Sequence, residues 1–202
     1  MQVLVTGGLG YIGSHTSVLL LEKGYDLVIV DDLSNSNEKV IENISQITSK
    51  VPVFEKIDLK DKESVSKLFN NYDFDGIIHF AAHKSVNESV NYPDKYFKNN
   101  VGSLENIIYE IQKLKKPMNF IFSSSCTVYG QADSMPINEC FELKKAESPY
   151  GQSKRKCEEI LENFHKTGHN FKNITLRYFN PIGAHPTSLI GELPIGIPEN
   201  LV

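Results

Sequence analysis

MQVLVTGGLGYIG, residues 1–13, is the stretch that decides the fold of this chain. Residues 1–6 form an apolar run rich in β-branched side chains, which is typical of a buried parallel strand. A G-x-G-x-x-G turn follows, and the pattern from about Ser14 to Lys23 predicts a helix that stops at Gly24. Glycines in such a turn let the backbone approach a pyrophosphate, and the helix N-terminus offers unpaired N–H groups. The stretch therefore predicts a dinucleotide site.

A carboxylate supports the same interpretation. The next predicted strand, Asp26 to Val30, ends at Asp31 and Asp32. Asp31 lies close to the expected spacing of about 20 residues beyond the glycines, where it can accept hydrogen bonds from the adenosine ribose. A carboxylate there would repel a 2′-phosphate, so the sequence favours NAD over NADP. A glycine-rich turn without a ligand is the alternative, and the combination of strand, helix and terminal acid argues against it.

Tyr150 and Lys154, in the stretch SPYGQSK, form a second candidate feature. Four residues apart on a helix, they would share one face. An ordinary Tyr has a pKa near 10, and lowering it to about 7 takes roughly 4 kcal/mol. A nearby fixed positive charge can supply much of that free energy. We therefore expect Tyr150 to act as a general base and Lys154 to lower its pKa, although two exposed helix residues would have the same spacing.

Strand and helix patterns alternate along most of the chain, which predicts an α/β fold with a doubly wound, Rossmann-like parallel sheet. The further predicted strands are Val51 to Phe54, Asp75 to Phe80, Met118 to Phe122 and Ile174 to Tyr178. The further predicted helices are Asn35 to Ser49, Lys62 to Asn70, Asp94 to Lys115 and Tyr150 to Lys166. We expect residues 1–180 to form the NAD-binding domain and residues 181–202 to begin a substrate-binding region.

Composition limits the remaining possibilities. The chain has 202 residues, 40% of them hydrophobic, and a net charge of −4, which predicts a soluble globular protein without a broad basic surface for nucleic acid. No apolar run approaches the roughly 18 residues of a membrane span, and the N-terminal strand leaves no room for a signal peptide. The three cysteines and the histidines lack metal-ligand or disulfide spacing. We therefore expect a cytoplasmic protein without a metal.

Four motifs together resemble the extended short-chain dehydrogenase/reductase family. They are TGGLGYIGSH (6–15), SSS (123–125), Tyr150-x-x-x-Lys154 and RYFN (177–180). More narrowly, VYG (128–130), NPIGAHP (180–186) and GIPENL (196–201) are similar to the UDP-glucose 4-epimerases of that family. The likeness runs along the whole chain. Family members continue beyond the position of Val202, so the resemblance implies that the substrate-binding region is truncated here.

The resemblance implies an isomerase that interconverts UDP-glucose and UDP-galactose by reversible hydride transfer to NAD, through a 4-keto intermediate. The Tyr150 phenolate would take the proton of the sugar 4-hydroxyl, and Ser125 would hydrogen-bond the same group. Lys154 would hold the nicotinamide ribose and, with the positive charge of the nicotinamide ring, lower the Tyr150 pKa. A homodimer is also implied, packed through the helices from Asp94 to Lys115 and from Tyr150 to Lys166.

Further contacts carry over by matching motif. The implied cofactor-binding residues are Gly7, Gly10, Tyr11, Ile12, Gly13, Asp31, Asn35, Ser36, Asp58, Leu59, Phe80, Ala81, Lys84, Asn99, Tyr150, Lys154 and Tyr178. The implied substrate-binding residues are Ser125, Tyr150, Asn180, Asn200 and Leu201. Asp58 is equally suited to cap the following helix, and the role of His83, where the family commonly has Leu, stays open.

Three alternatives compete with this interpretation. A nucleotide-sugar 4,6-dehydratase also needs an acid and a base near Ser125, and that family places Asp-Glu where this chain has Cys126 and Thr127. An epimerase of another UDP-sugar, N-acetylated or a uronate, fits the same motifs. A non-catalytic NAD-binding fragment is the third possibility if residues 1–202 are the whole molecule; such modules usually lack the tyrosine or the lysine, which this chain keeps.

Overall fold

A six-stranded parallel sheet forms the centre of the molecule. The computed structural model describes residues 1–194. The strands run in the order β3-β2-β1-β4-β5-β6. Their bounds are β1 Gln2–Thr6, β2 Asp26–Asp31, β3 Val53–Lys56, β4 Gly76–His79, β5 Met118–Ser125 and β6 Phe171–Tyr178. This arrangement confirms the predicted doubly wound α/β fold.

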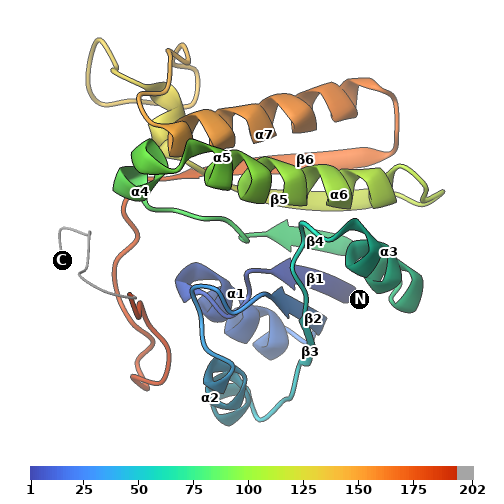
Figure 1. Cartoon of the computed structure of the whole chain (residues 1–202). Coiled ribbons are helices and arrows are strands. Elements are labelled where there is room, and N and C mark those ends of the chain that lie inside the picture. The colour runs from blue at the N-terminus through green and yellow to red at the C-terminus, as the bar shows by residue number, and fades with distance from the viewer. Residues whose placement is uncertain (195–202) are drawn as a thin grey trace.

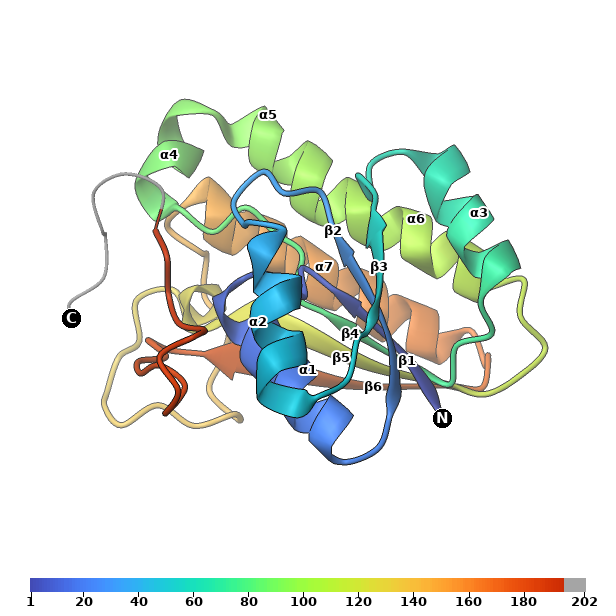
Figure 2. The ribbon, with the colours of Figure 1, turned by 90° about the horizontal axis from the view of Figure 1, so that it is seen from below.

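Helices cover both faces of the sheet (Figures 1 and 2). The helices α1 (Tyr11–Glu22) and α2 (Lys39–Thr48) pack on one face, where Val18 and Ile44 join a buried apolar cluster. On the other face lie α3 (Lys62–Asn71), α6 (Gly102–Ile111) and α7 (Pro149–Lys166), whose buried side chains belong to a second cluster. The central strands are apolar on both sides because both faces are covered.

The order of the strands locates the place where a ligand would bind. From β1 the chain first builds outward through β2 and β3, and then from β4 in the opposite direction through β5 and β6. In open parallel sheets, ligands bind beyond the carboxyl ends of the strands at the point where this direction reverses. Here that point lies between the loops that follow β1 and β4, and this predicted binding place is called the crevice below.

The predicted helical stretch from Asp94 to Lys115 is present, but it ends at Ile111 and is not a regular α-helix throughout. It consists of α5 (Pro93–Tyr96), a π-helical segment η1 (Phe97–Val101) and α6, which follow one another without a break. A further short helix, α4 (Val86–Asn91), precedes them and was not predicted. The wider turn of η1 buries the side chains of Asn99 and Asn100. Such π-helical turns are frequent at functional sites.

Other element boundaries differ by a few residues. Helix α1 begins at Tyr11, immediately after the glycine turn, rather than at Ser14. Helix α2 begins at Lys39 rather than Asn35, because hydrogen bonds to Asp31 hold residues 33–36 in a turn. A short 3₁₀ helix, η2 (Cys126–Tyr129), follows β5. Within residues 1–194, no helix combines the length and the apolar character that a membrane crossing requires.

Candidate functional site

The glycine turn after β1 leaves no room for side chains. Gly7 has φ +65°, and a Cβ atom there would lie 2.6 Å from the backbone nitrogen of Ala81. A Cβ atom on Gly13 would lie 2.2 Å from the carbonyl oxygen of Gly7. Gly10, the N-cap of α1, makes no side-chain cap, so no side chain of the N-cap residue occupies the first N–H groups of the helix. A cradle of this kind fits a phosphate or pyrophosphate.

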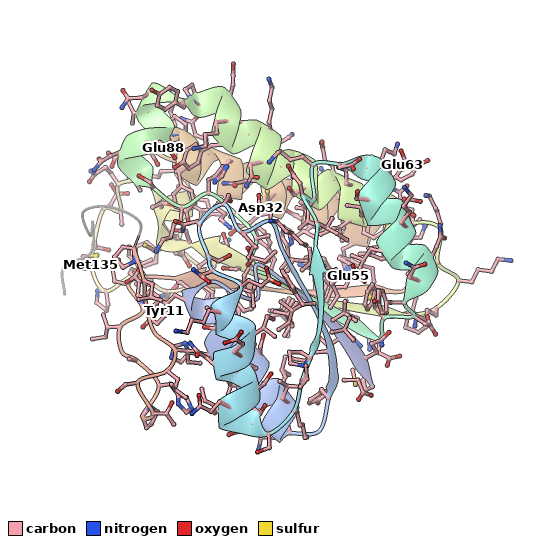
Figure 3. All side chains as sticks on the ribbon, turned by 60° about the horizontal axis from the view of Figure 1, so that its bottom comes forward. Tyr11, Asp32, Glu55, Glu63, Glu88 and Met135 are labelled. Carbon is pink, nitrogen blue, oxygen red and sulfur yellow. The ribbon has the colours of Figure 1, made fainter. Side chains whose placement is uncertain are left out.

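Asp31 stabilises the other side of this turn through hydrogen bonds. Its carboxylate is buried and accepts hydrogen bonds from the backbone N–H of Leu9 at 3.1 Å, the N–H of Leu33 at 3.0 Å and the hydroxyl of Ser36 at 2.7 Å. A carboxylate has about four acceptor positions, so one position is left for an outside donor. Asn35 is exposed in the same loop. Figure 3 shows this edge of the molecule, with Tyr11 and the neighbouring Asp32 labelled.

The segment after β3 brings Asp58 and Leu59 to the same edge. Asp58 accepts a hydrogen bond from the N–H of Lys60 at 2.9 Å, and Leu59 is buried. Asp58 is not the cap of the next helix, as the sequence had allowed, because the side chain of Asp61 accepts the N–H of Glu63 and caps α3. The Asp58 carboxylate instead forms an ion pair with the ammonium of Lys60 at 3.1 Å.

The loop after β4 contributes Phe80, Ala81 and Lys84. Phe80 N–H donates to the carbonyl of Thr6 at 3.0 Å, which holds this loop against β1. The Lys84 ammonium forms an ion pair with Glu192 at 2.6 Å. Asn99, buried in η1, accepts a hydrogen bond from the ammonium of Lys60 at 3.2 Å.

Tyr150 and Ser125 meet at the carboxyl end of β5. The N-cap of helix α7 is Ser148, whose hydroxyl accepts the N–H of Gly151 at 3.1 Å, and Tyr150 therefore lies in the first turn of the helix. Burial raises the pKa of Tyr150 above its ordinary value, and a hydrogen bond with Ser125 acts in the opposite direction. The Tyr150 ring also packs edge-on against Tyr96, with ring centroids 6.4 Å apart. A phenol and a hydroxyl so placed can share a proton with one substrate oxygen.

Lys154 lies on the same helix but is bonded elsewhere. Its side chain is 3% exposed, and its ammonium donates to the carbonyl oxygen of Ser123 at 2.7 Å. Burial lowers the pKa of Lys154 to about 8. The Tyr150 pKa is raised in this geometry, not lowered, so Lys154 alone does not produce the effect that the sequence suggested.

Asn100 lies next to the predicted Asn99 and was not singled out from the sequence. Its side-chain amide accepts the N–H of His83 at 2.8 Å, donates to the carbonyl of His83 at 3.1 Å and donates to the hydroxyl of Ser153 at 3.0 Å. It therefore joins the loop after β4 to α7. The only signal in the sequence is an Asn-Asn pair inside a helical pattern. His83 itself packs against Tyr96 at 5.6 Å between ring centroids, and burial lowers its pKa.

The remaining predicted residues come from the end of β6 and from the segment that follows it. Tyr178 ends β6 and is partly buried, which raises its pKa, and Asn180 is exposed just beyond it. Asn200 and Leu201 lie outside the described residues. Residues 1–194 bring no three His, Cys, Asp or Glu side chains together as a metal site.

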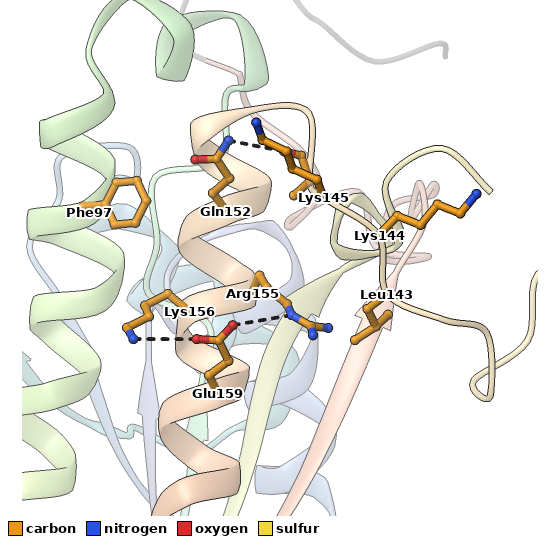
Figure 4. Close-up of a pocket in the computed structure, with 9 residues that line it drawn as sticks. Phe97, Leu143, Lys144, Lys145, Gln152, Arg155, Lys156 and Glu159 are labelled. Atoms are coloured by element: carbon orange, nitrogen blue, oxygen red, sulfur yellow. Dashed lines mark hydrogen bonds and ion pairs between the residues drawn. The ribbon is translucent and has the colours of Figure 1, made fainter.

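A hollow of about 380 Å³ lies away from this crevice, on the outer face of α7 (Figure 4). Phe97 and residues 143–146 form its walls, together with Arg155, Lys156 and Glu159. The two cations lie 3.7 Å and 3.6 Å from the Glu159 carboxylate. The hollow contains none of the predicted site residues, and the chemistry described above lies in the crevice.

Comparison with known proteins gives consistent matches. Residues 4–192 match the family described as GDP-mannose 4,6 dehydratase. The chain is 47% identical over 204 residues to UDP-glucose 4-epimerase uge1 of Schizosaccharomyces pombe, covering 99% of this chain and 57% of that protein. It is 46% identical over 202 residues to UDP-glucose 4-epimerase of Bacillus subtilis, covering 100% and 59%.

A solved structure shows the same arrangement of the backbone. The UDP-glucose 4-epimerase from Bifidobacterium longum, in complex with NAD+ and UDP, is 41% identical and superposes with a TM-score of 0.95. The match covers 100% of this chain and 60% of that one. The chain thus spans 57% to 60% of the length of these three proteins.

Proposed function

We propose that this chain carries the NAD-binding region of a UDP-glucose 4-epimerase. The chain belongs to the family described as GDP-mannose 4,6 dehydratase. The observation that carries the proposal is the meeting of Tyr150 and Ser125 at the carboxyl end of β5, beside a glycine cradle that fits a pyrophosphate. The named relatives support it, because the similar solved structure is described with NAD+ and UDP.

NAD fits the residues that line the crevice. The uncapped start of α1, with Gly10, Tyr11 and Gly13, would hold the pyrophosphate, and the free acceptor position of Asp31 would hold the adenosine ribose. Bound NAD would supply a reversible hydride acceptor next to the sugar. The other proposed contacts are Gly7, Ile12, Asn35, Ser36, Asp58, Leu59, Phe80, Ala81, Lys84, Asn99, Lys154 and Tyr178.

Tyr150 on α7 and Ser125 at the end of β5 would carry out the proton transfer. Tyr150 would remove the proton from the sugar 4-hydroxyl and later return it, while Ser125 would hydrogen-bond the same oxygen. Burial raises the Tyr150 pKa, so this phenol needs a positive charge close by when it acts as a base. Lys154, four residues along α7, would provide part of that charge after its ammonium leaves the Ser123 carbonyl.

Epimerisation fits these residues better than the dehydration in the family's name. Dehydration requires a carboxylic acid and a base next to Ser125. This chain has Cys126 and Thr127 there, burial raises the pKa of the Cys126 thiol, and the Thr127 hydroxyl donates to Ser125 at 3.0 Å. Neither side chain can act as a carboxylate.

The organisation of the whole protein is part of the same proposal. Residues 1–180 would be the NAD-binding domain, and residues 181–202, with Asn180, Asn200 and Leu201, would begin the region that binds the UDP-sugar. A cytoplasmic homodimer would pack through residues 94–115 and α7. Phe97 supports this assembly, since it is a large hydrophobic residue that remains exposed on the first of these segments.

Two measurements test the proposal. The purified chain should bind NAD, and reduction of the bound NAD should give the fluorescence of bound NADH. In a protein that extends through the complete substrate region, Tyr150→Phe should lower the conversion of UDP-galactose by about a thousandfold or more while NAD stays bound. Rates equal to those of the unaltered protein would remove Tyr150 as the base.

A further inference from the structure

The chain does not leave the sheet after β6 but turns back across its carboxyl edge. Figures 1 and 2 show the red segment leaving the end of β6 and running toward α1 and α2, on the opposite side of the molecule from α7. Residues 183–192 of this segment are called the strap here. Within the strap the N–H of His185 donates to the carbonyl of Ile190 at 3.0 Å, which closes it into a compact turn.

Three contacts anchor the strap to the helices that follow β1 and β2. Ile190 is 4% exposed and belongs to the apolar cluster beneath α1 and α2. The Asn43 side chain donates to the carbonyl of Leu189 at 2.8 Å. The Tyr11 hydroxyl, in the first turn of α1, donates to the carbonyl of Gly183 at 2.6 Å. The buried Ile190 and the two hydrogen bonds thus hold the strap against α1 and α2.

The other end of the strap reaches the opposite wall of the crevice. Glu192 lies 2.6 Å from the ammonium of Lys84, which belongs to the loop after β4. Tyr11 belongs to the loop and helix after β1. Strands β1 and β4 are the neighbours between which the direction of the sheet reverses, so the two contacts lie on the two sides of the crevice. The strap therefore links the elements that follow β1 and β4.

We infer that the strap retains the dinucleotide in this crevice and that Glu192 is a positioning residue for Lys84. The inference rests on the proposed function, since it takes NAD as the occupant. With the strap in place, NAD enters or leaves only after the Lys84–Glu192 ion pair opens. The Glu192 carboxylate also keeps the Lys84 ammonium over the cofactor side of the loop. Opening the strap should therefore speed both binding and release.

The test compares exchange rates of NAD in three variants of the full chain. Each protein is loaded with NAD and diluted into a dehydrogenase and its alcohol, which convert released NAD into fluorescent NADH. Glu192→Gln should raise the release rate about threefold, and the double variant with Ile190→Ala by about tenfold. Association rates, measured by rapid mixing, should rise as well. Glu162→Gln, which breaks an exposed ion pair with Lys166 on α7, is the matched control and should change neither rate.

The possible outcomes distinguish the role of the strap from the assignment of NAD as the ligand. A higher release rate without faster association would mean that Glu192 only contributes a contact, and would overturn the gating role. If both Glu192 variants bind NAD with unchanged association and release rates, the proposed role of the strap is overturned and the proposed function is not affected. No binding of NAD by the unaltered, folded protein would overturn both. Thermal unfolding of each variant without NAD shows whether the substitution has lowered the stability of the fold itself.

Discussion

Lys154 is a charged side chain that the fold buries at a cost. Its pKa falls from 10.5 to about 8 because burial disfavours the ammonium, and the charges of Cys157 and Glu158 offset part of this shift. Near pH 7 the group is still charged, and a shift of this size corresponds to about 3 kcal/mol at 1.4 kcal/mol per unit. Functional sites commonly carry such costs. This residue therefore lowers the stability of the ligand-free protein.

We predict that Lys154→Met stabilises the ligand-free chain by about 2 kcal/mol near pH 7, because it removes a buried charge but leaves the Ser123 carbonyl without a donor. The folded pKa lies below the unfolded one, so this residue's contribution to stability falls as the pH drops from 10.5 to about 8 and then stays constant. Urea unfolding at neutral and alkaline pH measures both effects. Lys166→Met, at an exposed site on the same helix, is the control. Equal or lower stability of Lys154→Met would contradict the prediction.

The burial of His79 should make the folded protein less stable in acid. It is fully buried, its Nδ1 atom lies 2.7 Å from the Thr6 hydroxyl, and burial lowers its pKa from 6.5 to about 3. Between these two values the unfolded chain binds a proton that the folded chain does not, so stability falls by about 1.4 kcal/mol per pH unit as the pH drops. His79→Leu should remove this part of the slope in urea unfolding between neutral pH and mild acid. An unchanged slope would contradict it, and His169→Leu, at an exposed position, serves as control.

At the scale of an element, the turn between β1 and α1 depends on the absence of side chains. Gly13→Ala would place a methyl group 2.2 Å from the Gly7 carbonyl oxygen, so the backbone must shift. We expect NAD binding to weaken by at least about tenfold and the melting temperature to fall. Fluorescence titration with NADH and thermal unfolding measure the two effects.

Gly102→Ala is the matched control for this substitution. Gly102 has helical φ and ψ angles and open space around its Cβ position. The substitution should raise the free energy of unfolding by about 0.5–1 kcal/mol through helix propensity alone. NAD affinity should not change. If both alanine variants bound NAD normally, the close approach of the turn to a ligand would be contradicted.

At the scale of the whole molecule, local patterns predicted most of the sheet. Runs such as residues 3–5 and 27–30 are apolar without interruption because both faces of the sheet are covered, and this can be recognised in a single segment. The glycine spacing and the terminal Asp31 likewise lie within one strand-turn-helix unit. The edge at which Asp31, Asp58, Phe80, Ser125 and Tyr178 gather follows from the parallel order of the strands.

Contacts between distant segments could not be predicted in this way. The π-helical segment is held by Asn100, which bonds to His83 and to Ser153, 17 and 53 residues away in sequence. The direction of the Lys154 side chain depends on Ser123, 31 residues away. The return of the strap depends on Ile190 fitting an apolar cluster formed by α1 and α2. None of these contacts leaves a periodic pattern in the sequence.

In the proposed function, the crevice between the loops that follow β1 and β4 holds NAD beside the Tyr150 phenol. The most direct measurement is the pKa of Tyr150, obtained by ultraviolet titration of the unaltered chain minus Tyr150→Phe, with and without saturating NAD. Without NAD the pKa should lie above its ordinary value, since burial dominates. With NAD, the account predicts that it falls below about 10, because a positive charge then lies next to the phenol. A Tyr150 pKa that is the same in both titrations, with NAD bound, would contradict the account.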